Sequence, residues 1–188
     1  VEGAIRAAHR RVLVEGDRDP ACRGMGTTLT LLLAEARRRR WTVGHVGDSR
    51  GYLLRNGELH RLTRDQTWVQ EEVERGRLEP AAAARHPMAS LLLQAVGNGL
   101  TLAPEVSSGE LLPGDLFLLC SDGLVRVLED EGLQEMLGRV AEGEDLSGVA
   151  EALVDAANRG GGPDNITVAL LRVLPSRGSP GDPPQERS

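Results

Sequence analysis

Aromatic residues are scarce in this chain of 188 residues. They make up 2% of the sequence and consist of Trp41, Tyr52, Trp68 and Phe117. Surfaces that bind single-stranded nucleic acid stack bases on aromatic side chains, so this scarcity argues against such a surface. The net charge of −6 argues the same way, because surfaces that bind nucleic acid are basic. Nucleic acid is not an expected partner, and the core is expected to consist of Leu, Val and Ala.

Cysteines and long apolar segments are also rare. Cys22 and Cys120 are too few for a disulfide framework, which indicates a reducing, cytoplasmic environment. No apolar run approaches the roughly 20 residues that cross a bilayer. No basic-then-apolar signal peptide opens the chain either. A membrane is therefore not an expected partner.

The chain begins abruptly. It starts with Val1 rather than Met, and apolar residues then recur at helical spacing at Ile5, Ala8 and Val12. No capping residue precedes them, so we interpret the beginning as the interior of a helix. The sequence is then expected to be a fragment whose N-terminal part is missing.

The apolar pattern predicts an α+β fold. Strands are expected over 27–33, 41–46, 52–55, 58–62, 116–120 and 166–174, and helices at the start, within 67–94, and over 133–140 and 146–157. Asn56-Gly57 is the strongest signal, because this dipeptide favours a two-residue hairpin turn. Successive strands with tight turns indicate an antiparallel sheet covered by helices. The length suits one domain, here 1–174, and Pro, Gly, Ser and charge predict a disordered tail over 175–188.

Three aspartates follow apolar segments at glycine-bearing turns. They are Asp48 in VGDSR, Asp122 in CSDGL and Asp164 in GGPDNIT. Magnesium and manganese prefer oxygen ligands, so aspartates that converge at strand ends suit such an ion and could support hydrolysis by an activated water. The alternative is structural: Asp48 and Asp164 could form turns, and Asp122 could cap a helix. The spacing alone does not decide between the two.

An ordered set of motifs resembles a known family. The set is GMGTT, VGHVGDSRGYLLRNGELHRLTRD, HP, GDLFLLCSDGL and GGPDNITVALL. In this order, from about Ile5 to Leu174, it resembles the metal-dependent (type-2C) serine/threonine protein phosphatases, particularly the bacterial ones. The resemblance implies an α-β-β-α sandwich of two antiparallel sheets flanked by helices, incomplete at its N-terminus.

The resemblance also implies a chemistry. Asp122 and Asp164 would bind two catalytic Mg2+ or Mn2+ ions, and Asp48 would support a third, weaker one. A water that bridges the metals would hydrolyse phosphoserine and phosphothreonine directly, without a phosphoenzyme. The stretch from Trp68 to His86 resembles a mobile flap that handles the substrate. The expected partners are phosphorylated proteins, with a cognate serine/threonine kinase as a further candidate in signal transduction.

The chain departs from the family in three respects. The family's phosphate-gripping Arg, acidic pair and metal-bridging DGxGG segment would precede Val1, so this chain alone is expected to be weak or inactive as a hydrolase. The alternative is a catalytically dead, phosphatase-like binding or regulatory module. Arg126 stands where many relatives carry an acid, and a cation there would repel a third metal. Gln66 stands where relatives often carry His, and the sequence assigns it no consequence.

Other candidate residues have structural explanations. His45 is expected to be a satisfied structural histidine, and Cys120 a buried, inert thiol. The glycine cluster 160–162 lacks the Lys-Ser/Thr of a phosphate-binding loop, so a turn explains it. The basic run 37–40 is expected to be a solvated turn.

Overall fold

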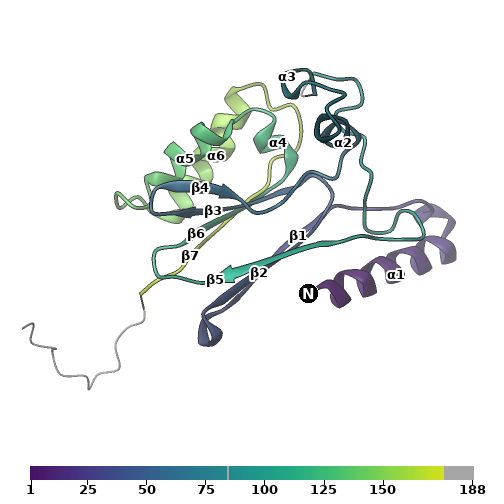
Figure 1. Cartoon of the computed structure of the whole chain (residues 1–188), viewed down its shortest axis with the longest axis horizontal. Coiled ribbons are helices and arrows are strands. Elements are labelled where there is room, and N and C mark those ends of the chain that lie inside the picture. The colour runs from purple at the N-terminus through teal and green to yellow at the C-terminus, as the bar shows by residue number, and fades with distance from the viewer. Residues whose placement is uncertain (84, 176–188) are drawn as a thin grey trace, which may run out of the picture.

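The computed structural model describes residues 1–83 and 85–175. The tail predicted over 175–188 lies outside the described residues except for Pro175. The strands form two antiparallel sheets, and helices cover their outer faces (Figure 1). The predicted α-β-β-α architecture is confirmed. In the described part of the chain, no helix combines the length and apolar character that crossing a membrane requires.

The smaller sheet contains β1 (Leu29–Glu35), β2 (Arg40–Val46) and β5 (Glu105–Glu110), in the order β1-β2-β5. β1 and β2 form a hairpin in which Leu29 faces Val46 across the strands. The short 3₁₀ helix η2 (Ala36–Arg38) and Arg39, whose backbone is left-handed at φ 49°, close this hairpin. The basic run is thus a turn over 37–39, as predicted, and its last residue, Arg40, begins β2.

The larger sheet contains β3 (Arg50–Arg55), β4 (Glu58–Arg61), β6 (Leu116–Cys120) and β7 (Val168–Arg172), in the order β4-β3-β6-β7. Asn56 and Gly57 join β3 to β4 with φ values of 53° and 82°. Two successive positive φ values are what a two-residue hairpin turn requires, so the predicted hairpin is confirmed. β6 lies between β3 and β7, which explains its continuous apolar sequence.

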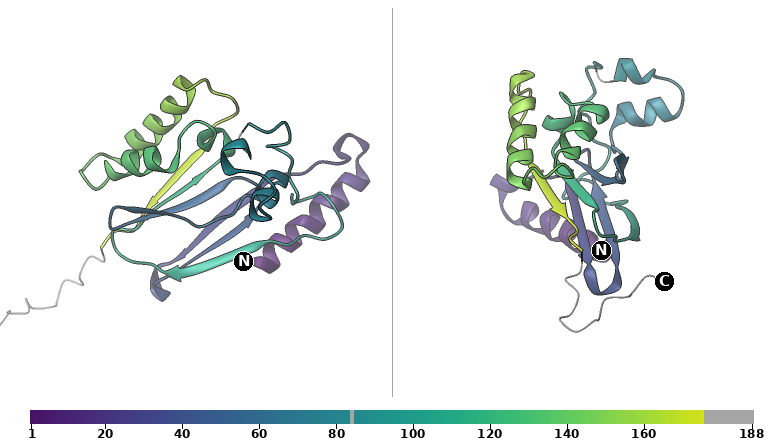
Figure 2. Two further views of the ribbon diagram at one scale, coloured as in Figure 1. Left: turned by 45° about the horizontal axis from the view of Figure 1, so that its top comes forward. Right: turned by 90° about the vertical axis from the view of Figure 1, so that its left-hand side faces the viewer.

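Helix α1 (Glu2–Arg18) lies along the smaller sheet (Figures 1 and 2). Its Ile5 is 1% exposed and packs in a cluster with Val46, Val96 and Leu102. The helix predicted at the start of the chain is confirmed. Of the residues whose spacing predicts it, Ile5 and Val12 pack on the sheet, whereas Val1 and Ala8 are exposed. A short 3₁₀ helix, η1 (Pro20–Cys22), follows α1.

Helices α5 (Asp130–Gly138) and α6 (Leu146–Arg159) cover the larger sheet (Figure 2). The fully buried cluster beneath them includes Tyr52, Leu118, Leu133 and Leu153. A second cluster fills the space between the two sheets, where Trp41 meets Phe117 edge to face with ring centroids 6.0 Å apart. These two clusters and the one beneath α1 hold the four layers together.

The segment predicted as helical over 67–94 is only partly so. It contains α2 (Trp68–Glu74) and α3 (Pro80–Ala83), and the rest of its described residues form turns and loops. The backbone N–H of Trp68 donates to the Leu91 oxygen at 2.9 Å, and a bridge joins Thr67 to Leu92. Because residues 91–93 pair with the start of α2, they are extended rather than helical.

Candidate metal site

A cleft of about 550 Å³ contains two of the three predicted aspartates. Asp48 follows β2 and Asp122 begins the short helix α4 (Asp122–Val125) directly after β6. Pro163, the neighbour of Asp164, also lines the cleft. The turns that follow β2 and β6 and precede β7 therefore meet at one place, as the strand-end argument requires.

The turns that carry Asp122 and Asp164 are fastened to each other. The Ser121 hydroxyl donates to the Asn165 oxygen at 3.0 Å and accepts from the Thr167 N–H at 2.9 Å. A Cβ added at Gly123 would lie 2.5 Å from the Asn165 oxygen, so only glycine permits this approach. The side chain of Ser121 and the absence of one at Gly123 bring together two aspartates that are 42 positions apart in the sequence.

Arg126 lies between these two aspartates. Its Nη2 is 2.5 Å from Oδ2 of Asp122, and its Nη1 is 4.0 Å from Oδ2 of Asp164. The pair with Asp122 spans one turn of α4. The guanidinium thus places a positive charge where the predicted ligands converge.

Asp48 has a perturbed acidity. Burial, and then the negative charges of Asp122 and Asp65, raise the pKa of its carboxyl to about 6, although the charge of Arg126 opposes the rise. These surroundings disfavour the ionised carboxylate, and a bound cation would stabilise it.

The donor chemistry fits a hard divalent cation. Carboxylate oxygens are the ligands that magnesium and manganese prefer. The ligand shell is nevertheless open, because within residues 1–83 and 85–175 no three acidic, histidine or cysteine side chains form a group that could hold a metal. Asp122 and Asp164 remain the candidate ligands, with Asp48 in the same cleft.

The sequence reasoning missed a charged network on the cleft wall. Arg50 donates to Asp65 from Nη2 at 2.8 Å and from Nε at 3.1 Å, and Arg61 also pairs with Asp65. The Tyr52 hydroxyl accepts from Arg50 at 3.2 Å and donates to Asp130 at 3.0 Å. Burial raises the pKa of this hydroxyl, so it stays protonated. Arg50 and Asp65 lie at the two ends of one hairpin. Their opposite charges at these positions were the signal from which the sequence could have predicted the ion pair.

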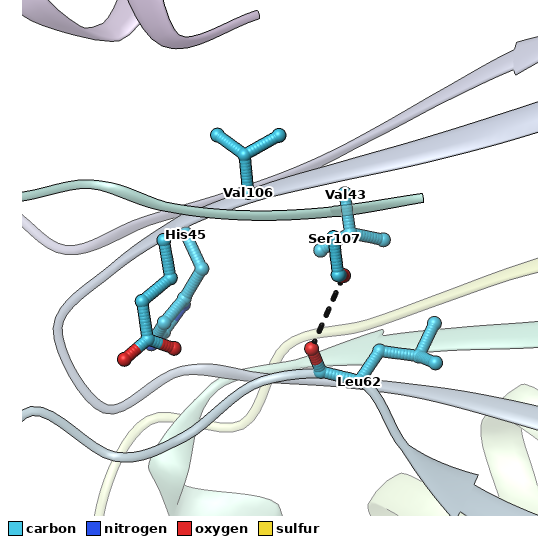
Figure 3. A pocket seen from close by; sticks show the side chains of 6 residues that line it. Val43, His45, Leu62, Val106 and Ser107 are labelled. Atoms are coloured by element: carbon cyan, nitrogen blue, oxygen red, sulfur yellow. Dashed lines mark hydrogen bonds between the residues drawn. The ribbon is translucent and has the colours of Figure 1, made fainter. Parts of the chain in front are cut away.

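His45 has the structural role that the sequence predicts. It is 1% exposed, its Nε2 lies 3.0 Å from the oxygens of both Gly47 and Arg64, and its Nδ1 lies 2.8 Å from the Thr30 hydroxyl. Burial lowers the pKa of the imidazole. Figure 3 shows His45 with Ser107 at a separate cavity of about 240 Å³. Because Nε2 is bonded to backbone carbonyl groups and Nδ1 to a hydroxyl, neither ring nitrogen of His45 is free to bind a metal.

Cys120 is not a nucleophile. The thiol is buried, and burial raises its pKa to about 12. Thiolate formation at neutral pH is therefore negligible, which agrees with the predicted inert role.

The predicted flap lies beside the cleft. Val69 and Gln70 of α2 and Ala83 of α3 line it, as does Ala89. Trp68 packs on His86 with ring centroids 5.1 Å apart, which ties α2 to the loop after α3. Val69, Ala83 and Ala89 thus form an apolar part of the cleft lining.

Comparison with known proteins agrees with these features. The family model for Protein phosphatase 2C matches residues 1–85. Serine/threonine protein phosphatase PstP of Mycobacterium tuberculosis is 42% identical over 176 residues, which cover 93% of this chain and 32% of that protein. Serine/threonine phosphatase stp of Listeria monocytogenes is 33% identical over 93% of this chain and 68% of its own length. The chain thus spans about a third of the Mycobacterium protein and about two thirds of the Listeria one.

Solved structures show the same fold. The crystal structure of the Mycobacterium tuberculosis PstP has a TM-score of 0.82 at 40% identity and covers 92% of this chain and 71% of that one. A structure of the catalytic domain of PstP in complex with two manganese ions has a TM-score of 0.80 at 39% identity, over 92% of this chain and 70% of that one. The two sheets and their covering helices are therefore the fold of these structures.

Proposed function

The chain belongs to the protein phosphatase 2C family, and from this premise we propose that it hydrolyses phosphoserine and phosphothreonine in proteins. The observation that carries the proposal is the fastening of the Asp122 turn to the Asp164 turn by Ser121 beside the cleft. A turn that only reverses the chain has no need of such a junction, whereas a site built from distant segments depends on it.

Asp122 and Asp164 are the residues that would hold two Mg2+ or Mn2+ ions, and Asp48 would support a third, weaker one. The manganese-bound PstP structure supports this choice of metal. When bound, such ions supply an activated water and neutralise charge on the phosphoryl oxygens. Asp48 is suited to the part, because burial, together with the charges of Asp122 and Asp65, raises its pKa, and a bound cation would stabilise its ionised form.

The other cleft residues would position the substrate. Val69, Ala83 and Ala89 form an apolar wall for side chains that flank the phosphorylated residue. Arg50 is committed to Asp65 and Tyr52, so it shapes the wall and is not free to grip phosphate. Arg126, with a side chain 39% exposed, is the other cation of the cleft lining, and it could turn toward a phosphate.

The setting of the activity follows from the same premise. Residues 1–174 form the phosphatase domain, and the substrates are phosphorylated proteins. A serine/threonine kinase must generate those substrates, so signal transduction is the context. The free thiols of Cys22 and Cys120 suit a reducing cytoplasm.

A second candidate function rests on Arg126. Its guanidinium is paired with Asp122 and lies 4.0 Å from Asp164, so a positive charge already occupies the place where a metal would be needed. A chain with this arrangement, and with an open ligand shell, could serve as a catalytically inactive module that binds phosphoproteins. The first function requires that a metal displaces Arg126, and the second does not.

Manganese-dependent hydrolysis of para-nitrophenyl phosphate and of a phosphothreonine peptide tests the proposal. The assay compares this chain with one extended by any coding sequence that lies upstream in frame, each with Asp122→Ala. Asp17→Ala, on the exposed side of α1, is the matched control. Hydrolysis that Asp122→Ala abolishes and Asp17→Ala preserves would support the phosphatase. Folded protein that is silent in both lengths, with manganese in excess, would favour the binding module.

A further inference from the structure

Gln66 forms hydrogen bonds with both the backbone N–H and the backbone oxygen of Gly47, the residue before Asp48. The Gly47 N–H donates to Oε1 of Gln66 at 2.9 Å, and the Gln66 N–H donates to the Gly47 oxygen at 2.8 Å. Gln66 is 5% exposed, so water does not compete for these bonds. A reciprocal pair of this kind fixes the position of Gly47 and the direction in which the chain leaves it.

Gln66 is itself fixed from two further directions. Its backbone oxygen accepts from the Leu93 N–H at 2.8 Å, and its Nε2 donates to the Ala103 oxygen at 3.4 Å. The amide therefore faces a donor with its oxygen and an acceptor with its nitrogen, and a flipped amide would lose both contacts. The side chain has one orientation available.

The remaining sides of the turn are held as well. The Ser49 hydroxyl lies 3.0 Å from the Thr28 hydroxyl, and His45 adds a second contact to the Gly47 oxygen at 3.0 Å. Gly47 has φ 107°, and a Cβ there would lie 2.4 Å from Thr28. Both neighbours of Asp48 are thus immobilised by uncharged groups.

Gln66 also connects this turn to helix α2, which lines the same cleft. The next residue, Thr67, caps α2, because its hydroxyl accepts from the Gln70 N–H at 3.2 Å. Asp48 and Gln70 both line the cleft. A single buried residue therefore links the turn that carries Asp48 to the start of α2.

We propose that Gln66 is a positioning residue that presents Asp48 to a divalent cation. The inference deepens the proposed function and rests on it, since it takes Asp48 as a metal-supporting group. Glutamine suits the role because it holds the turn without adding charge to a cleft that already contains Asp48, Asp65 and Asp122. It also does not titrate, so the grip on Gly47 does not change with pH.

Gln66→Met tests the proposal, because methionine keeps the length of the side chain and removes the amide. The matched control is Gln134→Met: Gln134 on α5 accepts the Leu59 N–H at 3.0 Å and does not line the cleft. Isothermal titration with MnCl2 measures binding, and Asp48→Asn identifies the share of it that depends on Asp48. We expect Gln66→Met to lower the affinity of the Asp48-dependent manganese binding by about 10-fold or more, because removing a group that orients a metal ligand has an effect of this size. Gln134→Met should leave that affinity unchanged.

A double-mutant cycle separates positioning from general loss of structure. In the Asp48→Asn background, Gln66→Met should change manganese affinity no further. An equal loss in both backgrounds would show that Gln66 supports the fold and not Asp48, which would overturn the proposal. If Gln66→Met does not fold, Gln66→Asn, which withdraws the amide by one methylene, is measured in the same cycle.

The proposal and the function on which it rests can fail separately. Manganese binding that is the same in the parent and in Asp48→Asn would overturn the role of Gln66. Phosphatase activity that Asp122→Ala abolishes would still stand in that case, because the two readouts depend on different aspartates.

Discussion

Arg126→Ala should strengthen the binding of divalent metal. Arg126 pairs with Asp122 at 2.5 Å and approaches Asp164 to 4.0 Å, so any cation that uses these carboxylates must displace its guanidinium. Removing the guanidinium removes a competitor. The variant therefore tests whether these two aspartates are the metal ligands, independently of any measurement of hydrolysis.

The magnitude follows from the exposure of the pairs. The side chains of Arg126, Asp122 and Asp164 are 39%, 26% and 47% exposed, so water screens their attraction. Exposed pairs of this kind contribute about 0.2–1 kcal/mol each. Losing both pairs, about 0.4–2 kcal/mol in total, corresponds to a gain of roughly 2- to 25-fold in metal affinity, since 1.4 kcal/mol is a factor of ten.

The gain should depend on pH and on salt. The charge of Arg126 opposes the rise in the pKa of Asp48, so the variant raises that pKa further above about 6. Protons then compete with the metal, and the gain in affinity should shrink as the pH falls from 7.5 toward 6. Higher ionic strength screens the removed charge and should reduce the gain as well.

Titration calorimetry with MnCl2 at pH 7.5 and low salt is the assay. Arg126→Lys keeps the charge and should bind manganese as weakly as the parent, whereas Arg126→Gln should behave like the alanine variant. Arg139→Ala, an exposed arginine on the end of α5, is the control for net charge. Equal or weaker binding in Arg126→Ala would refute the reasoning and remove Asp122 and Asp164 as a shared metal site.

Three further predictions concern stability. Asp115→Asn should lower the free energy of unfolding by about 2–4 kcal/mol in urea titration, because Asp115 is 1% exposed and accepts two hydrogen bonds of 2.7 Å from Arg55. Gly123→Ala should cost about 1–3 kcal/mol and weaken manganese binding, since its Cβ would meet the backbone of the facing turn at 2.5 Å; Gly132→Ala, with open space around it, should cost nothing. Burial lowers the pKa of His45 below 6.5, so the contribution of His45 to stability should be complete above that pH and fall by at most about 1.4 kcal/mol per unit below it, as the unfolded chain takes up the proton first. Urea titrations from pH 7.5 to 5 should show this slope in the difference between the parent and His45→Gln, because the titration of Asp48 is common to both.

Local signals made the hairpins predictable, and tertiary contacts made the middle of the chain unpredictable. Asn56-Gly57 needs only its own backbone to turn the chain, so the sequence sufficed. The stretch around residues 91–93 has a helical composition, but its hydrogen bonds go to Gln66 and Trp68, about 25 positions away. No window of the sequence contains both partners, and the long-range pairing overrides the local preference.

The candidate site divides in the same way. Asp122 and Asp164 could be picked out by their glycine-bearing turns, but spacing could not show that they meet, because Ser121 joins them across the fold. The contacts of Gln66 could not be predicted from the sequence for the same reason. Its partners, Gly47, Leu93 and Ala103, are brought together only when the chain folds.

The way in which the turns are fixed bears on the choice between the two functions. Neutral groups hold them: Gln66 and Thr28 at the Asp48 turn, and Ser121 at the other two. Asp164 gives one oxygen to its own turn, because its Oδ1 accepts from the Asn165 N–H at 2.8 Å. Its Oδ2 and the carboxylate of Asp122 face Arg126 and remain available to a ligand that displaces it. Among the ion pairs of the described residues, those that reach the candidate aspartates come from Arg126. In a phosphatase, a metal ion must displace the Arg126 guanidinium from Asp122 and Asp164, whereas in an inactive module the guanidinium stays paired with them. The manganese affinity of the parent, compared with that of Arg126→Ala, therefore decides between the two functions.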